Sequence, residues 1–230
     1  STETLRDRLF WPAWCGVAAL VASLLLGSYG VAPLLTFTLG GVASGAALRQ
    51  VVLATRRQGF RGLVGRANGG MIVHLGVILI AVSLGASNSF SKSQELSLVT
   101  NVEAQFSGHT FELRDVVEVR DDRSISVKAL VLVDGKKIYA PAITKYTRIG
   151  MNVGTPSVRT SLTTDIYLTL EPPVRQDSNE ARIKVFIKPM IMWLWIGTAL
   201  MAIGTVLAAF PGRRRKPTEP TSAPVEVAKS

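Results

Sequence analysis

The chain of 230 residues is poor in the side chains on which most soluble enzymes rely. It contains one cysteine, Cys15, and two histidines, His74 and His109. A single cysteine excludes a disulfide framework and a Cys-pair redox motif, and two distant histidines do not make a zinc cluster. The chain also lacks a phosphate-binding glycine loop, an H-E-x-x-H motif and a G-x-S-x-G motif. We therefore assign no catalytic residue, and any chemistry must involve His74.

Charged residues are also scarce, at 18%, whereas hydrophobic residues reach 47% and the mean hydropathy is +0.29. Four apolar runs are long enough to cross a hydrocarbon core of about 30 Å as helices. These runs cover residues 10–27, 31–54, 69–87 and 189–210. The first run is longer than the apolar region of a signal peptide, so we expect it to be retained. The composition predicts an integral membrane protein with four transmembrane helices.

The net charge of +10 is concentrated beside the apolar runs. Outside residues 88–188 there are twelve basic and four acidic residues, whereas fourteen basic residues face twelve acidic ones inside that stretch. Basic loops remain on the cytoplasmic side of a membrane. The basic loop 55–68, the basic tail 211–230 and both termini are therefore predicted to be cytoplasmic, with the tail disordered. This distribution favours membrane anchoring over nucleic-acid binding.

Residues 88–188 form one domain that this topology places outside the cytoplasm. Alternating β-branched and apolar residues predict strands at 110–119, 124–133, 165–170 and 181–187. Asp134-Gly135 is typical of a two-residue hairpin turn leading into 136–140. No stretch has a helical period of useful length, so we expect a small β-barrel or sandwich. The predicted fold class is therefore membrane α-helical with four transmembrane helices and one extracytoplasmic all-β domain.

Several polar or aromatic residues have simple structural interpretations. His109, in the sequence S-G-H-T, is expected in a surface turn, and the adjacent Asp121 and Asp122 in a solvated turn rather than an acid–base pair or cation site. Trp193 and Trp195 are expected to anchor the outer end of the last helix at the membrane interface. Pro189 suits the first turn of that helix.

His74 is different because it lies inside the uncharged run 69–87. Ionisable groups at membrane depth are costly and usually functional. Gly69, Gly70 and Gly76 remove bulk nearby and would permit close approach by a neighbouring helix or a flat ligand. A neutral imidazole is an axial ligand of haem iron, although a proton relay, a quinone contact and a helix–helix hydrogen bond remain open. His74 follows Arg66 by eight residues, about 12 Å of helix, which places it in the cytoplasmic half of the membrane.

Four sequence segments in one order resemble the C-terminal part of CcmF-type cytochrome c haem lyases, in the CcmF/CcsA-like haem-handling family. The segments are G-G-M-I-V-H-L-G-V, F-S-G-H-T-F-E-L-R-D-V, T-D-I-Y-L-T-L and I-K-P-M-I-M-W-L-W-I-G-T-A-L-M-A-I-G. The resemblance implies that His74 is one axial iron ligand of a b-type haem. It also implies that the other ligand lies in an N-terminal part that this chain lacks, together with the tryptophan-rich segment and the outer-face histidines of the lyase.

The same resemblance implies a C-terminal portion or split subunit of the lyase in a bacterial inner membrane, with residues 88–188 periplasmic. The implied partners are the N-terminal half of the lyase, the haem chaperone CcmE, apocytochrome c with its CcmH-type carrier, and quinol as a candidate electron donor. The implied reaction joins haem vinyl groups to cysteines of apocytochrome c, and whether this chain is itself an enzyme stays open. The alternative is a non-redox scaffold of a cytochrome assembly complex, including a ResB-like component, although W-L-W-I-G argues against ResB.

Overall fold

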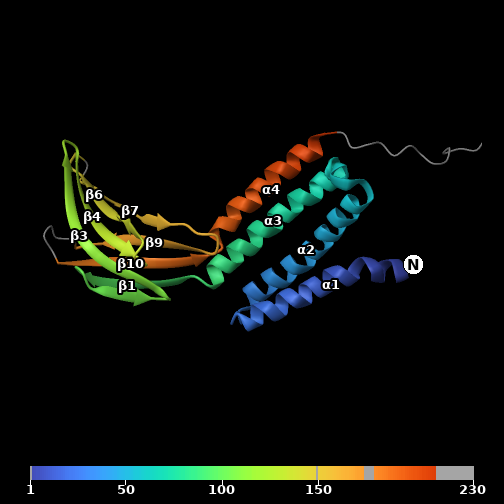
Figure 1. The fold of residues 1–230 in the computed structure, drawn as a ribbon, viewed down its shortest axis with the longest axis horizontal. Coiled ribbons are helices and arrows are strands. Elements are labelled where there is room, and N and C mark those ends of the chain that lie inside the picture. The colour runs from blue at the N-terminus through green and yellow to red at the C-terminus, as the bar shows by residue number, and fades with distance from the viewer. Residues whose placement is uncertain (1, 149, 174–178, 211–230) are drawn as a thin grey trace, which may run out of the picture.

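The computed structural model describes residues 2–148, 150–173 and 179–210. These residues form two parts, a set of long helices and an all-antiparallel β domain (Figure 1). The β domain is a single insertion between the third and fourth long helices. The predicted tail 211–230, including the cluster from Arg213 to Lys216, lies outside the described residues.

Four helices are long and apolar enough to cross a membrane. They are α1 (Thr2–Leu25), α2 (Val31–Gln58), α3 (Arg66–Ser89) and α4 (Ile191–Ala209), and a short 3-10 helix, η1 (Gly59–Leu63), joins α2 to α3. At the arginine-rich end, α1, α2 and α3 extend beyond the predicted apolar runs, because basic residues beside a membrane surface can continue a helix without being in hydrocarbon. Much of the predicted basic loop 55–68 is therefore helical.

The long helices lie side by side in chain order, and each packs mainly on its neighbours in the chain (Figure 1). The start of α1, the η1 connection and the end of α4 lie at one end of the layer, away from the β domain. The layer leaves wide helix surfaces without protein contact, as only 11–22% of each membrane-length window is buried. Such surfaces are suited to lipid or to further helices.

Glycines bring α3 and α4 into close backbone contact. A Cβ atom added at Gly69 would lie 2.5 Å from the backbone nitrogen of Ala208, and one added at Gly76 would lie 2.6 Å from the carbonyl oxygen of Gly197. On the other helix, a Cβ atom at Gly204 would lie 2.7 Å from the backbone nitrogen of Val73. Small residues at such spacing allow membrane helices to pack by backbone contact.

In the described residues of the β domain, ten strands form two antiparallel sheets. The four-stranded sheet has the order β1-β10-β9-β8, and the six-stranded sheet has the order β2-β3-β4-β6-β7 with β5 paired to β4. The strands are β1 (Lys92–Val99), β2 (Glu103–Phe106), β3 (His109–Asp121), β4 (Ser124–Val133), β5 (Lys137–Tyr139), β6 (Ala142–Tyr146), β7 (Asn152–Thr155), β8 (Ser157–Arg159), β9 (Thr164–Glu171) and β10 (Glu180–Pro189).

One apolar core joins the two sheets. Alternate residues of β1, β9 and β10 meet those of β3 and β4, and Phe111, Leu113, Val131, Ile183 and Val185 are fully buried. This alternation is the pattern of strands with one buried face, so the core follows from the sequence period of two. The four predicted strands correspond to β3, β4, β9 and β10, and the all-β character of this part is observed in the described residues.

Two local predictions were wrong. Asp134 and Gly135 do form the turn between β4 and β5, with positive φ and a hydrogen bond of 3.1 Å from the backbone nitrogen of Lys136 to the carbonyl oxygen of Val133. The predicted length of two residues was wrong, because Val133 pairs with Lys137 and the loop therefore contains three residues. Pro189 is the last residue of β10, where it pairs with Thr164, and α4 begins only at Ile191. Proline is tolerated there because the end of a strand needs no further donor.

Candidate functional site

His74 lies on an exposed face of α3. Residues at spacings of three and four share one face of a helix, and His74, Val77, Ala81, Leu84 and Asn88 follow this spacing. All five are exposed to the exterior of the chain. The contacts of α3 with α2 and α4 occupy other faces, so nothing within the described part of the chain covers His74.

The imidazole of His74 is oriented by its own helix. Its Nδ1 lies 2.8 Å from the carbonyl oxygen of Gly70, one turn earlier. A carbonyl oxygen can only accept a hydrogen bond, so Nδ1 carries a proton, and in the neutral ring the lone pair is on Nε2. This is the tautomer in which a histidine binds a metal through Nε2 while a backbone carbonyl orients the ring.

The glycines near His74 have two different roles. Gly69 and Gly76 contact α4, as described above, so they serve helix packing. Gly70 faces open space, since a Cβ atom added there meets nothing within 4 Å. Because Gly70 lies four residues before His74, it is on the same exposed face. Of the three glycines expected to admit a flat ligand, only Gly70 therefore has free space beside it.

On the exposed face of α3, His74 is the one side chain described above that could ligate haem iron. The described residues contain no group of three or more His, Cys, Asp and Glu side chains that could hold a metal ion. A haem iron needs one or two axial side chains rather than a cluster, so His74 fits one axial position and no more. His74 precedes Ser89, the last residue of α3, by fifteen residues, which is about 22 Å along the helix. The imidazole is therefore far from the β domain.

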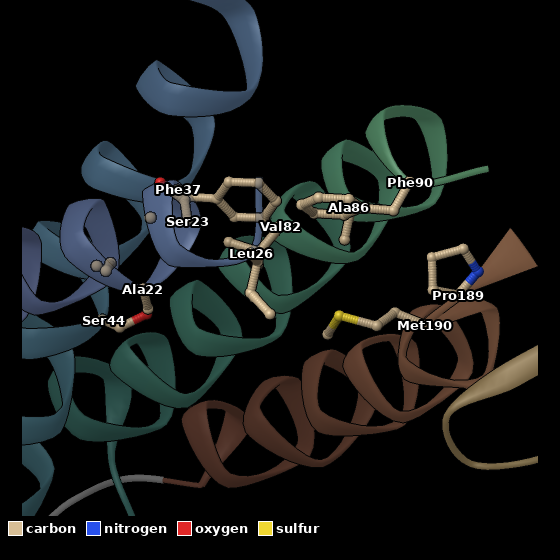
Figure 2. A pocket seen from close by; sticks show the side chains of 13 residues that line it. Ala22, Ser23, Leu26, Phe37, Ser44, Val82, Ala86, Phe90, Pro189 and Met190 are labelled. Carbon is tan, nitrogen blue, oxygen red and sulfur yellow. The ribbon is translucent and has the colours of Figure 1, made fainter. Parts of the chain in front are cut away.

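An apolar cavity of about 520 Å³ lies at the other end of the helices, beside the β domain. Figure 2 shows Leu26, Val82 and Met190 around it, together with Phe37 and Phe90, whose rings stack 6.1 Å apart. At about 100° per residue, the cavity-lining side of α3 lies almost opposite the face that carries His74. The cavity is thus separate from the histidine and does not supply a slot for its ligand.

A polar cluster in the β domain was missed by sequence reasoning. The carboxylate of Asp134 accepts hydrogen bonds from Arg159, from the backbone nitrogen of Thr110 at 3.0 Å and from Nδ1 of His109 at 3.0 Å. Burial opposes ionisation of Asp134, but the hydrogen bonds from Arg159, His109 and Thr110, with the charge of His109, lower its pKa to about 2. His109 thus begins strand β3 and is not a free surface-turn residue.

The remaining sequence candidates have structural contacts. Asp121, the last residue of β3, accepts a hydrogen bond from the backbone nitrogen of Asp122 at 2.8 Å, and Asp122 begins the turn to β4. Both residues are exposed, as expected for a solvated strand end. The indole nitrogen of Trp193 donates to the carbonyl oxygen of Leu162 at 2.9 Å, whereas Trp195 is 70% exposed. Trp193 therefore connects α4 to the loop before β9, although it is still 37% exposed. The anchoring of both tryptophans at a membrane interface stays a prediction.

No family model matches the chain. The chain is 26% identical over 207 residues to the cytochrome c-type biogenesis protein CcmF of Pseudomonas aeruginosa, and 28% identical over 205 residues to that of Pseudomonas fluorescens. Each match covers 86% of this chain and 31% of the relative. A solved structure named cytochrome c heme lyase CcmF has the same fold, with a TM-score of 0.67 and 18% identity over 90% of this chain and 34% of that chain. The resemblance to CcmF is therefore confirmed over most of the chain.

The chain spans about a third or less of the length of these CcmF proteins. The similarity includes both the helices and the β domain, since it covers most of the chain. The names of the relatives refer to whole proteins that are about three times as long.

Proposed function

We propose that this chain forms part of a cytochrome c haem lyase, in which it supplies one axial ligand to a b-type haem. The similarity to CcmF supports a role in cytochrome c biogenesis. The observation that carries the ligand assignment is the orientation of the His74 ring. Its Nδ1 is hydrogen-bonded to the carbonyl oxygen of Gly70, which leaves Nε2 for a ligand. The bound haem would supply one-electron redox chemistry.

The chain's own residues would hold and orient the imidazole. The hydrogen bond to the Gly70 carbonyl sets the tautomer and fixes the orientation of the ring. The absence of a side chain at Gly70 leaves room beside the ring for a planar group. Because α3 contributes one histidine, a second residue to hold the haem would have to come from the part of the lyase that corresponds to the unmatched length of the relatives.

The exposed face of α3 supports this arrangement. A histidine in contact with hydrocarbon is costly, so the face that carries His74, Ala81 and Asn88 is expected to be covered by protein or by the haem. The spacing of three and four residues matches the packing of two membrane helices at a small angle. We propose that a helix of the N-terminal part of the lyase packs on this face.

The depth of His74 favours a supporting role over a catalytic one. We place the β domain in the periplasm and both termini in the cytoplasm of a bacterium, since the arginine-rich end of the helices is opposite the β domain (Figure 1). His74 is then about 22 Å along α3 from the periplasmic end of the helix. His74 would then hold a haem whose one-electron chemistry, with quinol as the proposed donor, supports the reaction, while attachment of the substrate haem would occur elsewhere in the lyase.

The periplasmic β domain would meet the other components of the pathway. We propose CcmE, apocytochrome c and its CcmH-type carrier as partners of the assembled lyase, because CcmF relatives act in cytochrome c biogenesis. A non-redox scaffold, including a ResB-like component, remains the alternative, in which the same two parts assemble partners without haem.

The experiment compares the only two histidines of the chain. The tagged chain is purified from native membranes so that its partner subunits are retained, and the reduced absorption spectrum and haem-to-protein ratio are measured. We expect His74→Ala to abolish the b-type signal and His109→Ala to retain it, since His109 is bonded to Asp134 in the β domain. A full b-type spectrum in His74→Ala would exclude the ligand assignment, and a haem-free wild-type complex would favour the scaffold.

A further inference from the structure

The end of the helices away from the β domain contains two adjoining cavities between α1 and α2. One, of about 590 Å³, is lined by Arg8, Ala46, Arg49, Gln50, Leu53 and Arg57. The other, of about 400 Å³, is lined by Trp11, Val52 and Arg56 among others, and shares Arg49 and Leu53 with the first. A mostly polar cavity with three arginines therefore continues into a mostly apolar one.

Among the described residues, the arginines around these cavities have no acidic partner. The salt bridges in the described part of the chain all lie in the β domain. Arg8, Arg49, Arg56 and Arg57 have neither an ion pair nor a side-chain hydrogen bond among the described residues. Guanidinium groups without an acidic partner repel each other when they line the same cavities, so binding of an anion there would be strongly favourable.

Helix packing places Arg8 and Arg49 at one level. A Cβ atom added at Gly45 of α2 would lie 2.9 Å from the Cα of Pro12 in α1, and the two helices run in opposite directions. Arg8 lies one turn before Pro12, and Arg49 lies one turn after Gly45, so both extend from this contact toward the same end.

The length of α2 places this level at the boundary of the hydrocarbon. The apolar segment from Val31 to Arg57 has 27 residues, or about 40 Å of helix, which exceeds the roughly 30 Å of a hydrocarbon core. About 20 residues from Val31 suffice to cross that core, so Arg49 lies where lipid phosphates begin. Trp11, which is 60% exposed, lies beside Arg49 and has the amphipathic ring favoured at this depth.

From this geometry we infer a binding site for one anionic phospholipid of the leaflet at the arginine end. The phosphate is held in the polar cavity by Arg8, Arg49 and Arg57, because guanidinium groups form paired hydrogen bonds with phosphate oxygens. One acyl chain lies in the apolar cavity against Trp11 and Val52. Anionic lipid is favoured over zwitterionic lipid, since no described residue that lines the cavities has a carboxylate to pair with a headgroup ammonium.

The lipid site rests on the proposed membrane placement but not on haem binding. The full chain is reconstituted in nanodiscs containing equal amounts of phosphatidylglycerol and phosphatidylethanolamine, re-extracted in mild detergent, and analysed for retained lipid by mass spectrometry. We expect wild type to retain phosphatidylglycerol preferentially. Arg49→Gln combined with Arg57→Gln should lower that retention at least about tenfold, since two charge-assisted phosphate contacts are lost.

A matched control separates the site from general charge. Arg6→Gln combined with Arg61→Gln removes the same charge at the same end, from exposed residues outside both cavities, and should retain phosphatidylglycerol as wild type does. Arg49→Lys preserves the charge and the helix but lacks the paired donors, so intermediate retention is expected even if the double variant folds poorly.

Three outcomes would overturn the lipid site. These are equal retention in wild type and Arg49→Gln/Arg57→Gln, an equal loss in the Arg6/Arg61 control, and complete displacement of the lipid by inorganic phosphate, which would indicate a free-anion site. His74→Ala should leave lipid retention unchanged, because His74 is on α3 and does not line either cavity. Failure of the lipid site is therefore distinguishable from failure of the haem assignment.

Discussion

Replacing Gly76 with alanine should push α3 away from α4. The added methyl carbon would lie 2.6 Å from the carbonyl oxygen of Gly197 and 2.6 Å from Cγ of Met201. Ordinary van der Waals contacts at such a carbon begin at 3.4 Å, so the methyl group is about 0.8 Å too close. The Met201 side chain can rotate away, but the Gly197 oxygen belongs to the backbone of α4, and the whole helix must move.

The size of the effect follows from two opposing terms. Forcing an extra methyl group into a tight contact costs about 1–3 kcal/mol, whereas alanine is favoured over glycine in a helix by up to about 1 kcal/mol. We therefore expect Gly76→Ala to destabilise the pair of helices by about 1–2 kcal/mol. Gly70→Ala in the same helix meets nothing within 4 Å, so it should be neutral or stabilising.

The assay is unfolding of the full chain in mixed micelles by increasing dodecyl sulfate, followed by tryptophan fluorescence. Trp193 and Trp195 lie in α4 and report its separation from α3. A Gly76→Ala variant as stable as wild type, or a Gly70→Ala variant as unstable as Gly76→Ala, would refute the assignment of these two glycines. If His74 holds a haem, Gly70→Ala should also lower haem content without lowering stability, since its methyl group enters the open face beside the ring.

Two further predictions concern the β domain. The pKa of Asp134 is about 2, below the value of 3.8 for an unpaired carboxyl, so its contribution, at most about 2 kcal/mol, should be complete above pH 4 and lost as the pH falls toward 2. Asp134→Asn, which tolerates the positive φ of 52° at this turn, should remove that part of the pH dependence in denaturant unfolding followed by circular dichroism, and an unchanged slope would contradict the cluster. Trp193→Phe removes the donor to Leu162 and should cost about 1 kcal/mol, with faster amide exchange in the loop before β9. Unchanged exchange there would show that the indole bond does not hold the loop.

The elements with the strongest sequence period were the ones predicted correctly. Strands β3, β4, β9 and β10 have alternating apolar residues that fill the core, and four long apolar runs correspond to the four long helices. Strands such as β7, with the sequence N-V-G-T and no buried residue, were missed because an edge strand needs no apolar alternation. Their position depends on pairing with a neighbouring strand rather than on their own composition.

The polar contacts were the least predictable. Asp134 and Arg159 are separated by 25 residues, and no local pattern indicates that β4 and β8 end beside each other. Arg49 was visible in the sequence only as an interruption of an apolar run, and its position beside Arg8 depends on the antiparallel packing of α1 and α2.

His74 illustrates what the sequence and the tertiary structure each determined. The sequence alone determined that a histidine lies within a membrane-length apolar helix and that one histidine can supply one haem ligand, because both follow from the composition of a contiguous segment. The tertiary structure decided which face of α3 the imidazole occupies, which glycines contact α4 and which one leaves space beside the ring. Those features depend on how helices pack, and packing is set by the combined shape of several segments rather than by the period of any one of them.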